Sequence, residues 1–292
     1  MHIRPFRPEE DLPAVLAFLQ SVERETGIAP LGESKYVDLR GPGLGSGLIG
    51  GDGEILAYAH VLDHPASELT EMELVAAAHS SDGDLAAMVT AVLGLTPRRL
   101  LWWTFGETRA ARFAAPRLGV HRRLHKLVGA LPLTESRPET GDGRVAPFRP
   151  DIDDDAWLEV NNAAFHGHPE NGGWSRSDLA KRLSLDWFDA EGFRLWWVGE
   201  RLAGFCWTKR HDGVTGEIYV IGVHPDFQRK GLGRQIVVEA LWYLADVGCT
   251  TALLYVDTVN QSALRLYQSL GFELARVDRC FVVPKVWPHE VQ

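Results

Sequence analysis

An apolar stretch that runs into a glycine-rich loop and then a helix, at Val220–Arg234, constrains this sequence most. The loop reads Gln228-Arg229-Lys230-Gly231-Leu232-Gly233-Arg234. Glycines let a backbone approach a ligand closely, and the N–H groups that begin a helix form an anion site. Three basic side chains add positive charge, so the pattern predicts a pyrophosphate site. It is neither a Walker A loop nor a G-x-G-x-x-G fingerprint.

Two short segments occur twice along the chain. Pro5-Phe6-Arg7-Pro8 returns at residues 147–150, and Leu118-Gly119 returns as Leu270-Gly271. Matches at nearly the same spacing indicate tandem domains of like order. Between them, residues 134–144 read TESRPETGDGR, where proline, glycine and charge replace apolar periodicity. We therefore expect two domains, 1–140 and 141–292.

Periodicity predicts similar element orders in the two halves. In the second half, helices are expected at 153–165, from Ser175 or Ser177 to about 185, from beyond Gly231 to about 247, and at 260–270. Strands are expected at 193–199, 202–210, 217–223 and 251–257, with a strand pair within 272–284. In the first half, strands are expected at 3–6, 48–51, 54–62, 71–79 and 99–105, and helices at 9–25, 84–94 and 108–117. Both halves mix strands and helices, which predicts an α/β fold.

Composition narrows the function classes. The net charge is −9, which disfavours a nucleic-acid partner, and 45% hydrophobic residues suffice for a sizeable core. Three cysteines form no disulfide framework, and eleven histidines include no helix-spaced pair with a carboxylate, so we expect no metal. The N-terminus lacks a signal-peptide pattern, and no apolar run is long enough to span a membrane. We expect a cytoplasmic protein with a small-molecule partner.

The loop and its surroundings resemble a known superfamily. Q-x-x-G-x-G after a strand, preceded by Val223-His224-Pro225 and followed by Asn260 and Tyr267, resembles the coenzyme A loop of the GNAT acetyltransferases. The resemblance implies a mixed, mostly antiparallel central sheet flanked by helices, present here as two tandem GNAT-like domains, with acetyl-CoA as co-substrate. An ordinary glycine-rich turn is the alternative.

Acetyl transfer of this type needs three groups. A backbone N–H must hold the thioester oxygen as it gains negative charge, and Val223 is the expected donor. Glu217 begins the same strand and is expected to take the amine proton; a solvated strand-edge carboxylate is the alternative. Tyr267 lies two helical turns after Asn260, so both can face one groove. Tyr267 would protonate the departing thiolate unless it is only a core aromatic, and Asn260 would bind the pantetheine arm.

Several motifs resemble the mycothiol synthase family, whose members acetylate the cysteinyl amine of cysteinyl-glucosaminyl-inositol as the final step of mycothiol biosynthesis. The motifs lie at 161–165, 168–174, 207–209, 216–223, 254–256 and 267–272. The resemblance implies substrate contacts at Glu33, Glu170, Lys209, Glu217 and Tyr255. It implies coenzyme contacts at Ile221, Gly222, Val223, Gln228, Arg229, Lys230, Gly231, Leu232, Gly233, Arg234, Asn260 and Arg265.

Other interpretations remain open for these residues and for the chain. Glu170 and Lys209 are alternatively solvated charges, and Tyr255 a core residue. We expect a monomer and direct transfer, with passage of the acetyl group through the substrate's own thiol as a second route. The chain is alternatively a GNAT acting on a protein N-terminus or an aminoglycoside, or a non-catalytic acyl-CoA sensor.

The first half departs from the family pattern. Ser80-Ser81-Asp82-Gly83-Asp84 stands in place of a basic loop, and its carboxylates would repel a pyrophosphate. Ala115 falls about where Tyr267 lies in the other half. We therefore expect the first domain to be inactive in acetyl transfer, to bind coenzyme weakly or not at all, and to serve a structural role beside the second.

Overall fold

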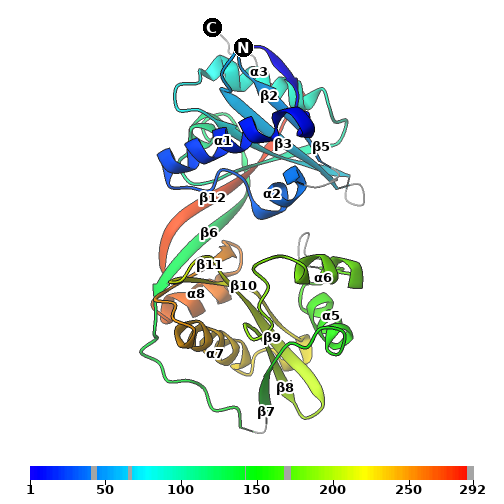
Figure 1. Ribbon diagram of the computed structural model, residues 1–292. Coiled ribbons are helices and arrows are strands. Elements are labelled where there is room, and N and C mark those ends of the chain that lie inside the picture. Colours follow the sequence, from blue (N-terminus) through cyan, green and yellow to red (C-terminus); the bar gives the residue numbers. More distant parts are fainter. Residues whose placement is uncertain (41–44, 65–67, 142, 168–171, 288–292) are drawn as a thin grey trace. The chain divides into compact units, whose positions relative to one another are not determined.

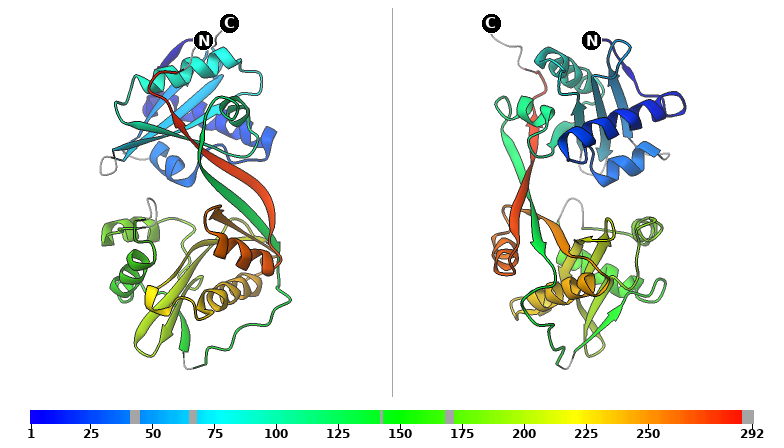
Figure 2. Two further views of the ribbon diagram at one scale, coloured as in Figure 1. Left: turned by 180° about the vertical axis from the view of Figure 1, so that it is seen from behind. Right: turned by 60° about the vertical axis from the view of Figure 1, so that its left-hand side comes forward.

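The computed structural model describes residues 1–40, 45–64, 68–141, 143–167 and 172–287 (Figure 1). The chain forms two compact units. The first contains Met1–His125 and Arg276–Gln292, and the second contains Lys126–Ala275. Each unit has a sheet covered by helices on both faces, as the views in Figure 2 also show.

In the first unit the strands follow the order β1 (Ile3–Pro5), β2 (Gly45–Gly50), β3 (Ala57–His64), β4 (Leu69–Ala76), β5 (Arg99–Thr104) and β12 (Glu273–Val283). Neighbouring strands pair antiparallel except β4 and β5, which are parallel. Helices α1 (Pro8–Thr26) and α2 (Glu33–Arg40) pack on one face. Helices α3 (Asp82–Leu93) and α4 (Arg109–Ala114) pack on the other.

In the second unit the order is the end of β6 (Val120–Ala130, with the unit boundary after His125), β11 (Thr251–Asp257), β10 (Thr215–Val223), β9 (Arg201–Arg210), β8 (Phe193–Val198) and β7 (Gly143–Pro147). Strands β7 to β10 pair antiparallel, and β10 and β11 pair in parallel. One face carries α5 (Asp154–Ala164) and α6 (Arg176–Leu183), and the other carries α7 (Leu232–Asp246) and α8 (Gln261–Ser269). The predicted mixed, mostly antiparallel sheet flanked by helices is confirmed.

Two apolar layers hold the second unit together. On the α5 face, aromatic rings form the core, with Phe193 stacked on Trp207 at 4.3 Å between centroids and Trp157 edge-on to both. On the α7 face, leucine and valine side chains of the helix pack against β9 to β11; Gly216 is required there because a Cβ would lie 2.6 Å from Leu244. The sheet is therefore buried on both faces, which fixes the register of β10.

The two structural units do not have the same boundaries as the two domains expected from the sequence, because the last residues of the chain belong to the first unit. Strand β12 pairs with β5, with Cys280 opposite Trp103. Phe281, Val283 and Trp287 enter the core of the first unit. Backbone pairing therefore assigns the end of the chain to the first unit, while the tandem division into 1–140 and 141–292 stays a prediction about sequence order. The expected strand pair within 272–284 is wrong, because that segment continues as one strand.

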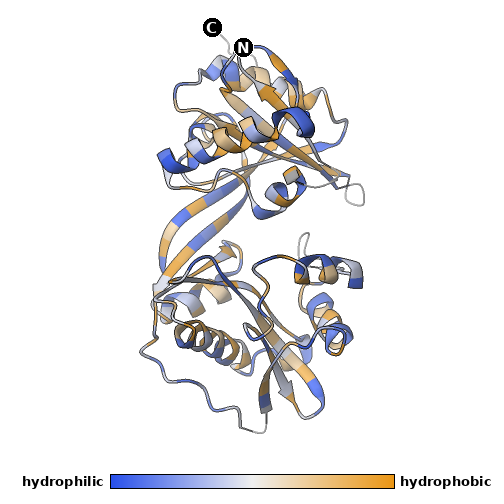
Figure 3. Cartoon of the chain, in the orientation of Figure 1, coloured by the Kyte–Doolittle hydropathy of each residue, from blue (hydrophilic) through white to orange (hydrophobic). Residues whose placement is uncertain are grey.

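The segment between the two repeats connects β6 to β7 and is largely hydrophilic (Figure 3). Its residues nevertheless contact the second unit. Arg137 pairs with Glu239 and Asp246 of α7, each at 2.7 Å. The Trp242 indole N–H donates to the Glu135 carbonyl at 3.0 Å. The predicted linker is therefore attached along α7.

Replacing Phe281 with alanine should destabilise the first unit by about 3–5 kcal/mol, because a fully buried ring leaves a cavity. Denaturant unfolding followed by tryptophan fluorescence would measure the change. Val286→Ala is the control, since Val286 is 76% exposed and only five residues further on. Equal stability of the two variants would contradict the packing of β12 in this core.

Candidate active site

Strands β10 and β11 separate halfway along their length. Their parallel pairing runs from Thr215 opposite Thr251 to Ile218 opposite Leu254. Beyond that point β10 pairs only with β9, up to Val223 opposite Gly204. A register shift at Tyr219 accompanies the separation. A bulge increases local twist, so β10 turns away from its parallel neighbour beyond this point.

The backbone N–H of Val223 faces the side from which β11 has separated. The next residue, His224, donates its N–H to Ala203 of β9 at 2.9 Å. Successive N–H groups of a strand point in opposite directions, so that of Val223 faces away from β9. The Gln228 side chain donates to the Val223 carbonyl at 3.0 Å and holds the peptide that follows Val223. The Val223 N–H therefore lies on the side of β10 that is turned away from β9.

The residues before Val223 approach β9 closely. A Cβ on Gly222 would lie 2.7 Å from the Phe205 ring, so this position requires glycine. Ile221, opposite Cys206, packs against the α7 core.

The glycine-rich loop lies directly after this strand. A short 3₁₀ turn, Pro225–Phe227, leads to Arg229 and Gly231, whose φ angles are +61° and +79°. Helix α7 then begins without a side-chain cap, and buried Leu232 anchors its first turn. A Cβ on Gly233 would lie 3.8 Å from Val223, so the helix start and the strand end are adjacent. Uncapped N–H groups beside exposed Arg229 and Lys230 suit an anionic ligand.

Arg234 has partners that the sequence did not reveal. Its guanidinium binds both carboxylate oxygens of Glu135, at 3.1 and 2.5 Å, and donates to the Ser269 hydroxyl at 2.6 Å. Glu135 belongs to the linker, far away in sequence. This side chain therefore joins the linker, α7 and the end of α8, and a phosphate would have to share it.

Glu217 is buried at the start of β10, on the face of the sheet that carries the aromatic core. The residue as a whole is 7% exposed, and its carboxylate oxygen Oε2 lies 2.6 Å from His211 Nε2. Lys209 is its cross-strand neighbour, and directly opposed residues project to the same face. The Lys209 ammonium lies 4.7 Å from the Trp187 ring centroid. A carboxylate, a histidine, an ammonium and an aromatic ring thus gather at one end of β9 and β10.

Helix α8 carries the next group of predicted residues. Asn260 caps the helix, accepting the Ala263 N–H at 3.1 Å, and Arg265 is exposed. Tyr267 is buried in the α7 core. Burial, with a smaller contribution from the Cys206 thiol, raises the Tyr267 pKa well above its usual value. The phenol therefore stays protonated at neutral pH, which is the form that an acid needs.

The other predicted substrate residues are less closely grouped. Tyr255 lies on β11, two residues after the Leu253 that pairs with Glu217, and is exposed rather than part of the core. Glu33 begins α2 in the first unit. Glu170 lies outside the described residues. His211, which sequence reasoning missed, becomes visible only once β9 and β10 are recognised as neighbouring strands.

In the first unit, the carboxylate that corresponds to Glu217 is that of Glu71, and it already has a cationic partner. Glu71 pairs with Leu101 of β5 as Glu217 pairs with Leu253 of β11. Burial opposes ionisation of Glu71, but the neighbouring His64 imidazole and the Lys35 ammonium at 2.5 Å lower its pKa to about 2. This carboxylate is therefore held ionised by a buried cation.

The loop of the first unit also differs from that of the second. Ser81 and Asp84 form a capping box that closes the start of α3. Asp82 binds Arg109 and Arg117 at 2.5 and 2.7 Å. The Asp84 N–H in the first turn of α3 has a side-chain partner here, whereas α7 begins without one, and the local charge includes two carboxylates.

Two features are absent from the described residues 1–40, 45–64, 68–141, 143–167 and 172–287. None of the helices in these ranges combines the length and apolarity needed to cross a membrane. Nor do the same ranges contain a group of three or more histidine, cysteine, aspartate or glutamate side chains suited to a metal ion.

The Acetyltransferase (GNAT) family matches residues 155–272. Three curated relatives carry the name mycothiol acetyltransferase. The chain is 36% identical to that of Acidothermus cellulolyticus, with 92% of this chain and 90% of the relative covered. It is 37% identical to that of Streptomyces coelicolor, with 94% and 96% covered. It is 39% identical to that of Mycobacteroides abscessus, with 88% and 91% covered.

Solved structures share the fold at low sequence identity. A tandem GNAT protein from the clavulanic acid biosynthesis pathway aligns with a TM-score of 0.75 and 16% identity, covering 99% of both chains. A GCN5-related N-acetyltransferase from Sphaerobacter thermophilus aligns with a TM-score of 0.72 and 18% identity, covering 97% of this chain and 95% of the other. These likenesses support a tandem GNAT fold.

Proposed function

Because this chain belongs to the mycothiol acetyltransferase family of GNAT acetyl-transferring enzymes, we propose that it acetylates the cysteinyl amine of cysteinyl-glucosaminyl-inositol. Acetyl-CoA is the acetyl donor, and the products are mycothiol and CoA. The observation that carries this proposal is the high coverage of relatives with that name. It is supported by the order of Glu217, the end of the β10–β11 pairing at Ile218, Val223 and the α7 loop along one segment.

Three groups of this chain would carry out the transfer. Glu217 takes a proton from the substrate ammonium, directly or through water, and leaves a neutral nitrogen. That nitrogen bonds to the thioester carbon, and the Val223 N–H stabilises the negative oxygen that forms. The carbon–sulfur bond then breaks, and Tyr267 protonates the departing thiolate. The nitrogen loses its second proton to water as the amide forms. Glu217 then releases its proton to water, and the Tyr267 phenolate takes one back before the next turnover.

The coenzyme would lie along the α7 loop. Backbone N–H groups from Arg229 to Gly233 suit its pyrophosphate, with Arg229 and Lys230 adding charge. The Asn260 side-chain oxygen is used by the helix cap, so its amide N–H₂ is the part available to the pantetheine arm. Exposed Arg265 lies on the same helix. Neutralisation by Glu135 would make Arg234 the weakest phosphate contact of the loop.

The substrate would be recognised by groups that match its chemistry. A pseudo-disaccharide with many hydroxyl groups is bound by side chains that donate and accept hydrogen bonds and by an aromatic ring that packs against the sugar. Lys209, Glu217 and Tyr255 supply these from neighbouring strands. Glu33 and Glu170 remain proposed contacts on the family resemblance alone.

We further propose that only the second unit binds acetyl-CoA tightly. The first unit keeps a cavity of about 350 Å³ lined by Ala76, Ala78, Thr108 and Arg109, but its loop is capped and acidic. Calorimetric titration of the full chain with acetyl-CoA should give one tight site per chain. Lys230→Ala should weaken that site, while Arg109→Ala should leave it unchanged. Two tight sites, or weakening by the Arg109 variant, would contradict the proposal.

CoA release from acetyl-CoA tests the function itself. The purified chain would be assayed with cysteinyl-glucosaminyl-inositol, a peptide and an aminoglycoside. Rapid release with the first amine alone is expected, and mass spectrometry should find the acetyl group on nitrogen. Release only with another amine would replace the substrate, and none with any amine would favour an acyl-CoA sensor. Rapid-quench detection of a transient thioester on the substrate would indicate the route through its thiol.

A further inference from the structure

We propose that His211 is a positioning residue for the base Glu217. It would hold one carboxylate oxygen, so that the other faces the substrate amine. The inference rests on the proposed function, and it adds a residue that neither the loop motif nor the family motifs include. The observation behind it is a short contact between two side chains at the edge of the proposed site.

The contact is short and directional. His211 Nε2 lies 2.6 Å from Glu217 Oε2. Within the described part of the chain, His211 is the one hydrogen-bond and ion-pair partner of this carboxylate. The Glu217 side chain is 9% exposed and that of His211 is 37% exposed. The ring therefore connects a buried carboxylate to solvent, and Oε1 is left for the amine.

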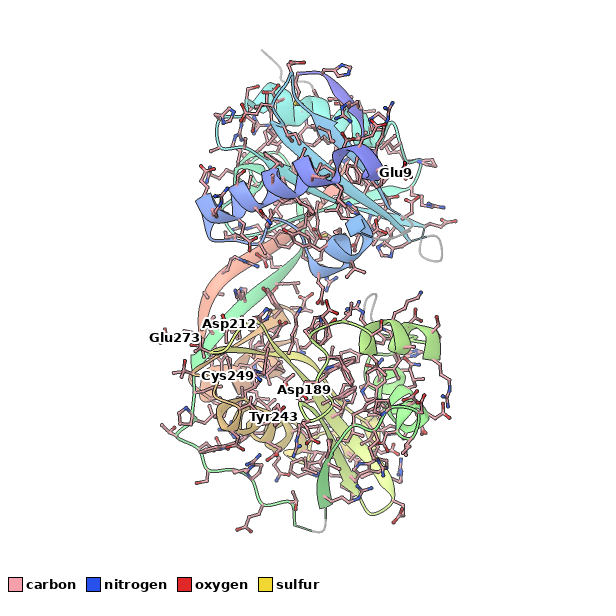
Figure 4. All side chains as sticks on the ribbon, viewed as in Figure 1. Glu9, Asp189, Asp212, Tyr243, Cys249 and Glu273 are labelled. Atoms are coloured by element: carbon pink, nitrogen blue, oxygen red, sulfur yellow. The ribbon has the colours of Figure 1, made fainter. Side chains whose placement is uncertain are left out.

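The turn between β9 and β10 fixes the ring in this place. The His211 N–H donates to the Thr215 carbonyl at 3.0 Å. Asp212 Oδ1 accepts the N–H groups of Val214 and Thr215 at 2.8 and 2.6 Å, and these backbone bonds lower the Asp212 pKa. Figure 4 labels Asp212 at this turn. An Asp that binds the backbone two residues on is a typical turn-forming device, so the position of His211 does not depend on substrate.

The same pair recurs in the first unit. His64 ends β3 and lies 3.5 Å from Glu71, as His211 follows β9 and lies beside Glu217. In the first unit, however, Lys35 also binds the carboxylate, at 2.5 Å. In both units, therefore, a histidine lies beside a glutamate, and the two glutamates occupy equivalent positions in their strands. Only in the second is the histidine its single partner among the described residues.

This arrangement suits a base that must act from one oxygen. A carboxylate free to rotate would present either oxygen and would spend part of its time in nonproductive orientations. An imidazole N–H bound to Oε2 fixes the rotation about the last bond of the side chain. It also satisfies an oxygen that is mostly removed from water. The expected effect of losing it is on kcat rather than on acetyl-CoA binding.

The test compares His211→Leu, His211→Gln and the matched control His64→Leu. We expect His211→Leu to lower kcat about 10- to 100-fold with KM for acetyl-CoA unchanged. Glutamine places an amide N–H at about the same reach, so His211→Gln should recover most of the activity. His64→Leu should turn over like the wild type. In a Glu217→Gln background, His211→Leu should cause little further loss, because the two residues act as a unit.

Two results would overturn the proposal: full activity of His211→Leu, or an equal loss in the Glu217→Gln background. If wild-type chain accepts a different amine, the same comparison on that amine still decides the role of His211. A readout without turnover completes the test. The ring ¹⁵N signals of His211 should change on Glu217→Gln and stay unchanged on Glu200→Gln, an exposed carboxylate in the β8–β9 turn. Unchanged His211 ring signals in the Glu217→Gln variant would also contradict the proposed contact between His211 and Glu217.

Discussion

Glu217→Gln should lower kcat for acetyl transfer by about 100- to 10,000-fold at neutral pH, which is the usual contribution of a positioned base. Glutamine keeps the size of the side chain and can still accept a hydrogen bond from His211. It cannot take a proton from the substrate ammonium. Steady-state release of CoA measures the loss, and titration with acetyl-CoA should show unchanged affinity. Glu200→Gln is the control, because Glu200 is exposed at a turn.

The pH dependence of this variant follows from the amine. An α-amino group has a pKa near 8, so raising the pH through this value produces neutral nitrogen without a base. The rate of Glu217→Gln should therefore rise with pH, and the gap to the wild type should narrow above about pH 9. A gap that stays constant from pH 6 to pH 10 would indicate that Glu217 has another role.

Tyr267→Phe should lower kcat by about 100-fold, because the CoA thiolate would leave without an acid beside it. The Tyr267 pKa is raised by burial, so its proton is present throughout the neutral range and the loss should not depend on pH there. The assay is again CoA release, with KM for acetyl-CoA expected to change little.

Tyr243→Phe is a matched control for this prediction. Tyr243 is also a buried tyrosine of the second unit, with a pKa raised first by burial. Its hydroxyl donates to Asp189 at 2.5 Å, and Figure 4 labels the two residues beside each other. The variant should lose about 1.5–3 kcal/mol of stability, as for a hydrogen bond to a charged group, and keep its turnover. Equal turnover by both phenylalanine variants would remove Tyr267 from the mechanism.

Local patterns in the sequence predicted most of the second unit. Strand β11 was predicted with its observed limits, and the limits of β10 and α7 differ by one or two residues. The reason is that hydrophobic periodicity and glycine positions are set within short windows. In the first unit α2 was missed, since its eight residues carry few apolar positions and the apolar run around it is weak.

Some residues of the proposed site could be found from the sequence, and others could be found only from the structure. Glu217, Val223 and the loop lie within one strand–loop–helix segment, so the motif locates them together. His211 and Glu135 acquire their contacts through folding: one lies across a hairpin from Glu217, and the other belongs to a linker that packs on α7. Spacing along the chain carries no signal for such pairs, because the backbone brings them together only after the sheet has formed.

The sequence by itself determined the tandem order of elements, the position of the glycine-rich loop and the family to which the chain belongs, since each is encoded in contiguous residues. Tertiary structure alone decided which side chains surround Glu217, what binds Arg234, and that the last strand completes the sheet of the first unit. Those outcomes depend on backbone pairing and burial between segments far apart in sequence, whose register is fixed only when both faces of a sheet are packed.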